Sequence, residues 1–291
     1  MLDEIRYEAP TSLARAIELL SESGARVLAG GTDLLVQMRT GRAAPRVFVD
    51  VKRIPETMRL ELGPTELWLG AAVPAAQVTE HRDIGRVWPG LVEAVDLIGS
   101  TQIQGRASVG GNVCNASPAA DTTPALCAVS ARCVIAGPRG QREVPVEQFN
   151  TGPGKNSLAR GELLVGFRIA RPAARASDAY LRFIPRTEMD IAVVGAGVSV
   201  ALDSAGRCTA ARVALGAVAP TVILVSDSAG ALIGSRGEDA ALTRAGDAAS
   251  AAARPISDKR GTVEYRRRIA GVLVRRAAAA AFERARGGGT A

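Results

Sequence analysis

Two stretches decide the fold, Ala29-Gly30-Gly31-Thr32-Asp33 and Ser108-Val109-Gly110-Gly111-Asn112, and each follows an apolar, strand-like segment. Glycine has no Cβ, so paired glycines allow backbone turns that are closed to other residues and bring N–H groups close to an anion. Two such turns can hold one diphosphate between them. We therefore predict that the chain binds a dinucleotide.

The residues around the first motif predict a small α/β lobe over about residues 1–55. Apolar periodicity and turn residues set the order of its elements. These are a helix capped by Thr11 or Ser12 that ends near Gly24, a short buried strand at 26–29, the glycine turn, a short helix at 34–39 and a strand at 47–51.

The residues around the second motif predict an α+β lobe over about residues 56–175. An Arg-, Pro- and Ala-rich segment at 171–177 indicates a linker after it, so we expect one domain over residues 1–175. The elements predicted in this lobe are a strand at 67–71, helical periodicity over 74–99, and strands at 134–136, 144–146 and 163–169.

Residues 176–286 predict a smaller C-terminal domain. Residues 191–202 and 208–218 alternate apolar with small or polar residues around a turn, which is typical of an antiparallel meander. From Glu238 onward the chain is Ala-rich and helical, and a helix at 263–286 places apolar residues on one face and arginines opposite. We expect residues 287–291 to form a flexible tail.

Composition and charge narrow the classes of function. The chain has 291 residues, of which 47% are hydrophobic, and a formal net charge of +7. Its basic residues are dispersed, only 3% of residues are aromatic and no nucleic-acid-binding signature is present, so we expect no nucleic-acid partner. The charge indicates either a solvated basic surface or a docking face for acidic partner subunits or an anionic dinucleotide.

The N-terminus and the cysteines indicate a cytoplasmic protein. Asp3 and Glu4 stand where a signal peptide needs basic residues, and no later run reaches transmembrane length, so we expect no membrane insertion. The four cysteines form no CxxC pair, so neither a zinc site nor a conventional iron–sulfur loop is recognisable. We expect reduced thiols, with Cys114 packing as a small hydrophobe rather than acting in redox chemistry.

Several other features carry no chemistry of their own. The stretch from Val193 to Val198 resembles the start of a Rossmann fingerprint, but Val200 occupies the third glycine position and no helix pattern follows. We therefore interpret its glycines as packed within a sheet. The single histidine, His81, has no second His or cysteine pair nearby, so we expect it to be solvated and predict no metal site. No nucleophile–base pair is recognisable, and we predict no catalytic residue.

The second motif continues as Val113-Cys114-Asn115-Ala116-Ser117-Pro118-Ala119-Ala120-Asp121-Thr122-Thr123-Pro124-Ala125-Leu126. From Ser108 onward this string resembles the FAD-binding signature of the molybdenum hydroxylase flavoproteins, the xanthine dehydrogenase and carbon monoxide dehydrogenase group. Residues 29–35 resemble the first flavin loop, and residues 257–276 resemble the C-terminal helix of the family. The resemblance implies the two-lobed FAD-binding fold of the vanillyl-alcohol oxidase and p-cresol methylhydroxylase type, followed by a small antiparallel α+β domain.

The resemblance also implies where FAD binds. The glycines would present N–H groups to the pyrophosphate, while Thr32, Ser108 and Asn112 add side-chain donors. Asp121 would accept hydrogen bonds from ribityl or ribose hydroxyls, and it alternatively, or in addition, caps the helix that follows. The residues that we expect to bind FAD are Leu28, Ala29, Gly30, Gly31, Thr32, Asp33, Leu34, Ile98, Ser108, Val109, Gly110, Gly111, Asn112, Ser117, Asp121, Arg182 and Ile191.

The stretch from Arg182 to Ile191 resembles a family segment near the isoalloxazine. Reduced flavin is negatively charged at its pyrimidine end, so Arg182 and Arg186 would raise its potential. The alternative is that Arg186, Glu188 and Asp190 form surface ion pairs. Ile98 occupies a position that packs on the flavin in the family, and it is aliphatic here.

The function implied by the resemblance is electron transfer. The chain would be the FAD-containing subunit of a molybdenum hydroxylase, taking electrons from [2Fe-2S] clusters of a small subunit and passing them to NAD or another acceptor. A large molybdenum–pterin subunit would oxidise the substrate, and the complex would be a dimer of heterotrimers. No cysteine lies between Leu35 and Trp68, so we expect FAD alone in this chain. The alternatives are a self-sufficient FAD-dependent oxidoreductase and a flavin-free assembly subunit.

Overall fold

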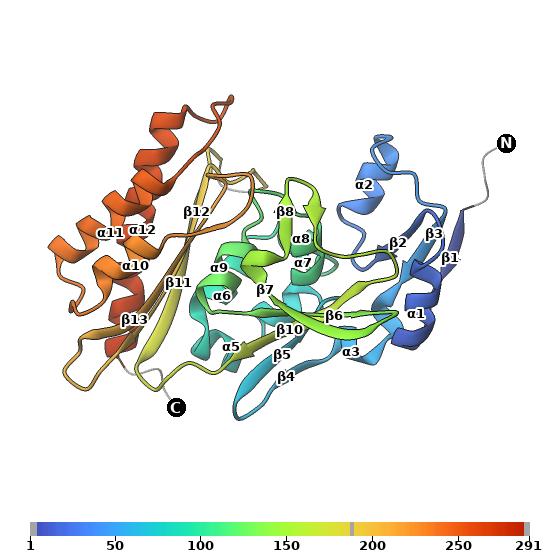
Figure 1. Ribbon diagram of the computed structural model, residues 1–291, viewed down its shortest axis with the longest axis horizontal. Helices are drawn as coiled ribbons and strands as arrows, with labels where there is room; N and C mark the ends of the chain where they lie inside the picture. Colours follow the sequence, from blue (N-terminus) through green and yellow to red (C-terminus); the bar gives the residue numbers. More distant parts are fainter. Residues whose placement is uncertain (1–4, 187–188, 288–291) are drawn as a thin grey trace.

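The computed structural model describes residues 5–186 and 189–287. The chain runs from a small sheet beside the N-terminus, through a central sheet with several short helices, to a third sheet covered by long helices at the opposite end (Figure 1). This arrangement confirms the expected fold class, a two-lobed FAD-binding part followed by a smaller antiparallel domain. Of the predicted tail, residues 288–291 lie outside the described residues.

The first lobe has the predicted elements around a parallel sheet of order β1-β3-β2. Ser12 caps its first helix by accepting a hydrogen bond from the N–H of Arg15. One expectation was wrong, because β2 is only partly buried and Val27 is 38% exposed. The reason is that this strand lines a groove. The elements are β1 (Arg6–Glu8), α1 (Leu13–Leu20), β2 (Ala25–Leu28), α2 (Leu34–Arg39) and β3 (Val47–Asp50).

The second lobe is built on an antiparallel sheet of order β4-β5-β10-β6-β7. Apolar side chains of this sheet and of helices α4–α9 form one buried core. The elements are η1 (Val51–Arg53), α3 (Pro55–Met58), β4 (Leu60–Leu62), β5 (Glu66–Gly70), α4 (Ala75–Thr79), α5 (Arg82–Val87), α6 (Pro89–Asp96), α7 (Thr101–Gln104), α8 (Val109–Cys114), α9 (Thr122–Ala128), β6 (Arg132–Gly137), β7 (Gly140–Pro145), η2 (Val146–Gln148), β8 (Asn150–Gly152), β9 (Lys155–Asn156) and β10 (Leu163–Ala170).

The second glycine motif differs from the expected strand-entered turn. The short helix α7 precedes it, and Ser108 is the N-cap of α8, so Gly110 and Gly111 lie in the first turn of a helix. Helical propensity did not indicate helix α8, because adjacent glycines disfavour a helix. The cap hydrogen bond from the Gly111 N–H to the Ser108 side chain stabilises the turn.

The C-terminal domain is the predicted meander, of order β11-β12-β13-β14. Its helices cover one face of the sheet, and the other face meets the second lobe (Figure 1). Two details were not predicted, namely helix α10 and the burial of Arg266, which was expected on the exposed face of the last helix and is only 4% exposed. The elements are β11 (Ala176–Phe183), β12 (Val194–Leu202), β13 (Cys208–Gly216), β14 (Ile223–Leu224), α10 (Ser226–Leu232), α11 (Asp239–Ala252) and α12 (Val263–Arg286).

A row of polar side chains joins this sheet to the second lobe. Asp178, Ser199 and Arg212 are neighbours across β11, β12 and β13. Asp178 accepts a hydrogen bond from the N–H of Leu91 at 2.9 Å, Ser199 donates to the carbonyl of Ala128 at 2.6 Å, and Arg212 donates to the carbonyl of Cys127 at 2.9 Å. The two parts of the chain are therefore tied by hydrogen bonds as well as by apolar packing.

The Rossmann-like glycines lie in this interface, which confirms that they are packed within a sheet. A Cβ on Gly197 would lie 2.6 Å from the carbonyl oxygen of Pro124 in α9. The sheet can approach α9 so closely only because glycine has no side chain at this point.

None of the helices among residues 5–186 and 189–287 combines the length and apolar character that a membrane span requires.

Candidate functional site

A groove of about 700 Å³ opens between strand β2, the first glycine loop, helix α8 and the segment that leads into β10. Most of the predicted FAD-binding residues line it, although the two glycine motifs lie far apart in the sequence. The predicted residues that line the groove are Leu28, Ala29, Gly30, Gly31, Thr32, Asp33, Leu34, Ile98, Ser108, Gly110, Gly111 and Asn112.

Two of the four glycines are required by the packing of backbone against backbone. A Cβ on Gly30 would lie 1.9 Å from the carbonyl oxygen of Arg106, and one on Gly110 would lie 2.3 Å from that of Ala71. Gly31 has a φ of +78°, which L residues rarely adopt. Gly30 and Gly110 therefore bring the walls of the groove together, a role that we had not predicted for them.

Gly111 has a different role. Its N–H, which we had expected to face a phosphate, donates to the Ser108 side chain at 3.0 Å. A Cβ at this position would meet only that same hydroxyl oxygen, at 3.2 Å, so the space beside Gly111 is otherwise open. Because Gly111 lines the groove, its missing side chain leaves room for a ligand.

A chain of side-chain hydrogen bonds connects the two motifs across the groove. The Asn115 amide donates to the Asp33 carboxylate at 3.2 Å and accepts from the Gln37 amide at 3.0 Å. Burial raises the pKa of Asp33. Sequence reasoning missed Gln37 and Asn115, and only the family string that runs through Asn115 could have drawn attention to one of them.

We expect Asn115→Ala to weaken FAD binding about three- to tenfold, because it removes both hydrogen bonds that join helix α2 and Asp33 to the second motif. The dissociation constant can be measured by quenching of flavin fluorescence in the full-length chain. Gln141→Ala, which removes an exposed amide on β7, serves as the matched control. Equal dissociation constants for the two variants would contradict the bridging role.

Five predicted residues do not line the groove. Val109 is fully buried, the Ser117 hydroxyl accepts a hydrogen bond from the N–H of Ala119, and Ile191 is 53% exposed. The side chains of Asp121 and Arg182 are only 11% and 6% exposed and form an ion pair with an N–O distance of 2.8 Å. The structure thus brings these last two predicted residues together, but away from the groove surface.

Asp121 occupies the N-cap position of helix α9, as the alternative predicted, but its side chain accepts no capping hydrogen bond from that helix. Instead, the Tyr180 hydroxyl donates to one carboxylate oxygen at 2.9 Å, and Arg182 donates to the other. Burial raises the pKa of Asp121 to about 6, although both partners oppose the rise. Sequence reasoning missed Tyr180, whose position two residues before Arg182 on a strand places both side chains on one face.

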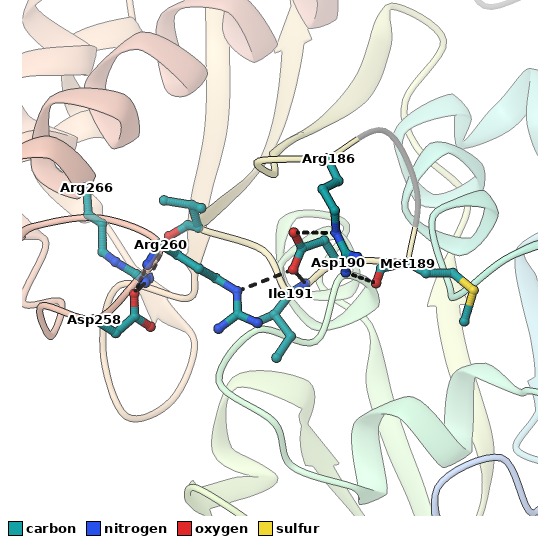
Figure 2. Close-up of polar contacts among 8 residues, drawn as sticks. Arg186, Met189, Asp190, Ile191, Asp258, Arg260 and Arg266 are labelled. Atoms are coloured by element: carbon teal, nitrogen blue, oxygen red, sulfur yellow. Dashed lines mark hydrogen bonds and ion pairs between the residues drawn. The ribbon is translucent and has the colours of Figure 1, made fainter.

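The predicted ion pair between Arg186 and Asp190 is present, with an N–O distance of 3.2 Å, and Arg186 is mostly exposed (Figure 2). Asp190 also pairs with Arg260, which lies in the loop before α12. Asp258 of that loop pairs with the buried Arg266. Glu188, which we expected to join this cluster, lies outside the described residues. The cluster ties the segment between β11 and β12 to the loop that precedes α12, both within the C-terminal domain.

The chemistry of the groove fits FAD. Its volume lies in the range of about 300–1,000 Å³ that is typical of cofactor sites. Its lining combines apolar side chains such as Leu28 and Ile98 with glycine backbone and with Thr32 and Asn112, which suits flat rings joined by a diphosphate. Cys114 also lines the groove, and burial raises its pKa to about 12, so the thiol stays neutral as expected.

Two family descriptions match the chain. The FAD binding domain in molybdopterin dehydrogenase matches residues 3–172, and the CO dehydrogenase flavoprotein C-terminal domain matches residues 179–281. Together they span nearly the whole sequence, with the change between them close to the segment that joins β10 to β11.

Individual relatives agree with these matches. The xanthine dehydrogenase FAD-binding subunit of Escherichia coli O157:H7 is 35% identical over 77% of this chain and 77% of its own length. The carbon monoxide dehydrogenase medium chain of Hydrogenophaga pseudoflava is 32% identical over 96% of this chain and 97% of its own. A solved structure of carbon monoxide dehydrogenase from that organism, lacking the Mo-pyranopterin moiety, superposes with a TM-score of 0.91 at 33% identity, covering 97% of this chain and 98% of that one.

Proposed function

The chain belongs to the FAD-binding subunits of the molybdenum hydroxylase family, and from this premise we propose that it relays electrons from [2Fe-2S] clusters of a partner subunit to NAD or another acceptor. The observation that carries the proposal is the groove, where two glycine motifs meet around a space of cofactor size. In this proposal residues 1–175 are the FAD-binding domain and residues 176–286 the C-terminal domain.

FAD supplies the redox chemistry when it is bound, since it accepts two electrons and can release them singly or together. The chain's own residues bind and orient it. The glycine loop and helix α8 would hold the diphosphate, Thr32 and Asn112 would donate to its oxygens, and Ile98 would pack against a ring. The Oδ1 atom of Asn112 already accepts from the Thr122 hydroxyl at 2.6 Å, which leaves its amide hydrogens for the ligand.

The partners follow from the same proposal. The chain would assemble with a large molybdenum–pterin subunit and a small [2Fe-2S] subunit in the cytoplasm, as a dimer of heterotrimers. The formal charge of +7 supports acidic partner surfaces. The chain by itself would oxidise no organic substrate.

The test has two stages. We expect the purified full-length chain to carry or take up FAD, which is identified by its visible spectrum and by the mass of the flavin released with acid. Mixed with its partner subunits and their substrate, the flavin should bleach only when all three subunits are present. A chain that refuses FAD would contradict the binding role, and bleaching without partners would indicate a self-sufficient oxidoreductase.

A further inference from the structure

A buried polar cluster connects the C-terminal domain with the second lobe. It consists of Tyr180 and Arg182 on β11 and of Asp121 at the start of α9. The Tyr180 hydroxyl and the Arg182 guanidinium each hold one oxygen of the Asp121 carboxylate, at 2.9 and 2.8 Å. Tyr180 is 2% exposed and Asp121 is 8% exposed, so water does not replace these partners. Each carboxylate oxygen is thereby fixed from across the domain interface.

Two short connections lead from this cluster to the groove. Arg182 also donates to the carbonyl of Leu97 at 3.0 Å, and the next residue, Ile98, lines the groove. Thr122, which follows Asp121, donates its hydroxyl to the side chain of Asn112, another lining residue. The positions of two groove residues therefore depend on the place of Asp121 and Arg182.

The sheet has a slot for the tyrosine. A Cβ on Gly195 would lie 2.4 Å from the Tyr180 hydroxyl oxygen and 3.2 Å from its Cζ atom. Arg182 is the direct cross-strand neighbour of Gly195, and Tyr180 is its diagonal neighbour. The absent side chain at Gly195 leaves room for the phenol, whose hydroxyl reaches Asp121.

We propose that Tyr180 is a positioning residue for the FAD site, through which the C-terminal domain holds Asp121 and, with it, the groove wall at Ile98 and Asn112. The inference rests on the proposed FAD-binding function. It assigns to the C-terminal domain a part in cofactor affinity, although none of the described residues of that domain lines the groove. The ligand that this cluster affects is FAD, so the quantity to measure is the affinity for FAD rather than a rate of turnover.

The test compares Tyr180→Phe with Ser199→Ala in the full-length chain. Each variant removes one hydroxyl that donates a hydrogen bond across the same domain interface, but the partly buried Ser199 bonds to Ala128, which does not line the groove. We expect Tyr180→Phe to raise the FAD dissociation constant about tenfold, because a hydrogen bond to a charged group is lost, and Ser199→Ala to change it less than about twofold. Melting temperatures of both variants measure the structural loss separately.

A second variant keeps the tyrosine hydroxyl but displaces it. Gly195→Ala should weaken FAD binding in the same direction as Tyr180→Phe, since its Cβ occupies the slot. Equal dissociation constants for Tyr180→Phe and wild type, or an equal rise for Tyr180→Phe and Ser199→Ala, would overturn the positioning role while leaving FAD binding by the wild type intact. A wild-type chain that binds no FAD would instead overturn the proposed function.

Discussion

Gly111→Val is expected to lower the affinity for FAD about 100-fold or more while the chain still folds. The two γ-methyl groups of valine would extend from helix α8 into the groove that Gly111 lines. The fold has room for this change, because the new Cβ meets only the Ser108 hydroxyl oxygen, at 3.2 Å. Valine also has a higher helical propensity than glycine, so the first turn of α8 should persist.

The neighbouring glycines would give a different result. Gly30→Ala places a Cβ 1.9 Å from the carbonyl oxygen of Arg106, so the two loops must separate. That variant should lose both thermal stability and FAD affinity. Gly111→Val should lose affinity alone, which makes it the cleaner test of where the cofactor lies.

Titration with FAD, followed by fluorescence quenching, gives the affinity, and thermal unfolding followed by circular dichroism gives the stability. Gly85→Val is the matched control, since Gly85 also lies in a short helix with open space beside it but outside the groove. The melting temperature of Gly111→Val should stay within the few degrees that about 1 kcal/mol produces in a chain of this size. Retention of wild-type affinity would show that FAD does not approach α8.

The sequence predicted the local elements well because each has a local signal. Ser12 caps α1, and the alternation over residues 191–202 gave a strand of the meander. The resemblance of each motif to the family also led to the groove residues on both. Helix α8 was missed because two adjacent glycines favour a turn, while the cap at Ser108 and the packing against Ala71 stabilise a helix instead.

What the sequence could not reveal is held by contacts between distant segments. Tyr180 reaches Asp121 across 59 positions of the chain, and nothing near either residue marks the pair. Gly30 looked like a phosphate-binding glycine, yet its clearest constraint is the carbonyl of Arg106. Such constraints arise only when two loops or two domains meet, and no periodicity within one segment contains them.

The second large effect concerns Asp178, whose carboxylate is buried at the domain interface. One oxygen accepts from the Leu91 N–H, and the other has no hydrogen-bond partner among the described residues. Burial raises the pKa of Asp178 to about 7 and Glu93 of helix α6 adds to the rise, whereas the backbone N–H groups of Gly90 and Leu91 and, more weakly, Arg284 of α12 oppose it. In an unfolded chain an aspartate has a pKa of about 3.9, so folding favours the protonated form.

The sign of the pH dependence follows from that difference. The stabilisation from protonated Asp178 is complete below about pH 4, declines as the pH rises and is gone above about pH 7. The variant Asp178→Asn has no proton to lose. Its free energy of unfolding should therefore rise relative to that of the wild type as the pH increases across this window. At about 1.4 kcal/mol for each tenfold change in proton affinity, the gain reaches as much as about 4 kcal/mol.

Urea unfolding at a series of pH values from about 4 to about 8, which spans the window set by these two pKa values, measures this gain as a difference between variant and wild type. The amide group can add a constant offset to the free energy of unfolding, but only the change of the difference with pH reports the protonation of Asp178. Ser199→Ala, the neutral neighbour in the same polar row, should show a difference that does not vary with pH. If the Asp178→Asn difference were equally flat, the carboxylate would have to be ionised and compensated in the folded protein. The domain interface would then carry a negative charge opposite Arg284, rather than a neutral carboxyl group.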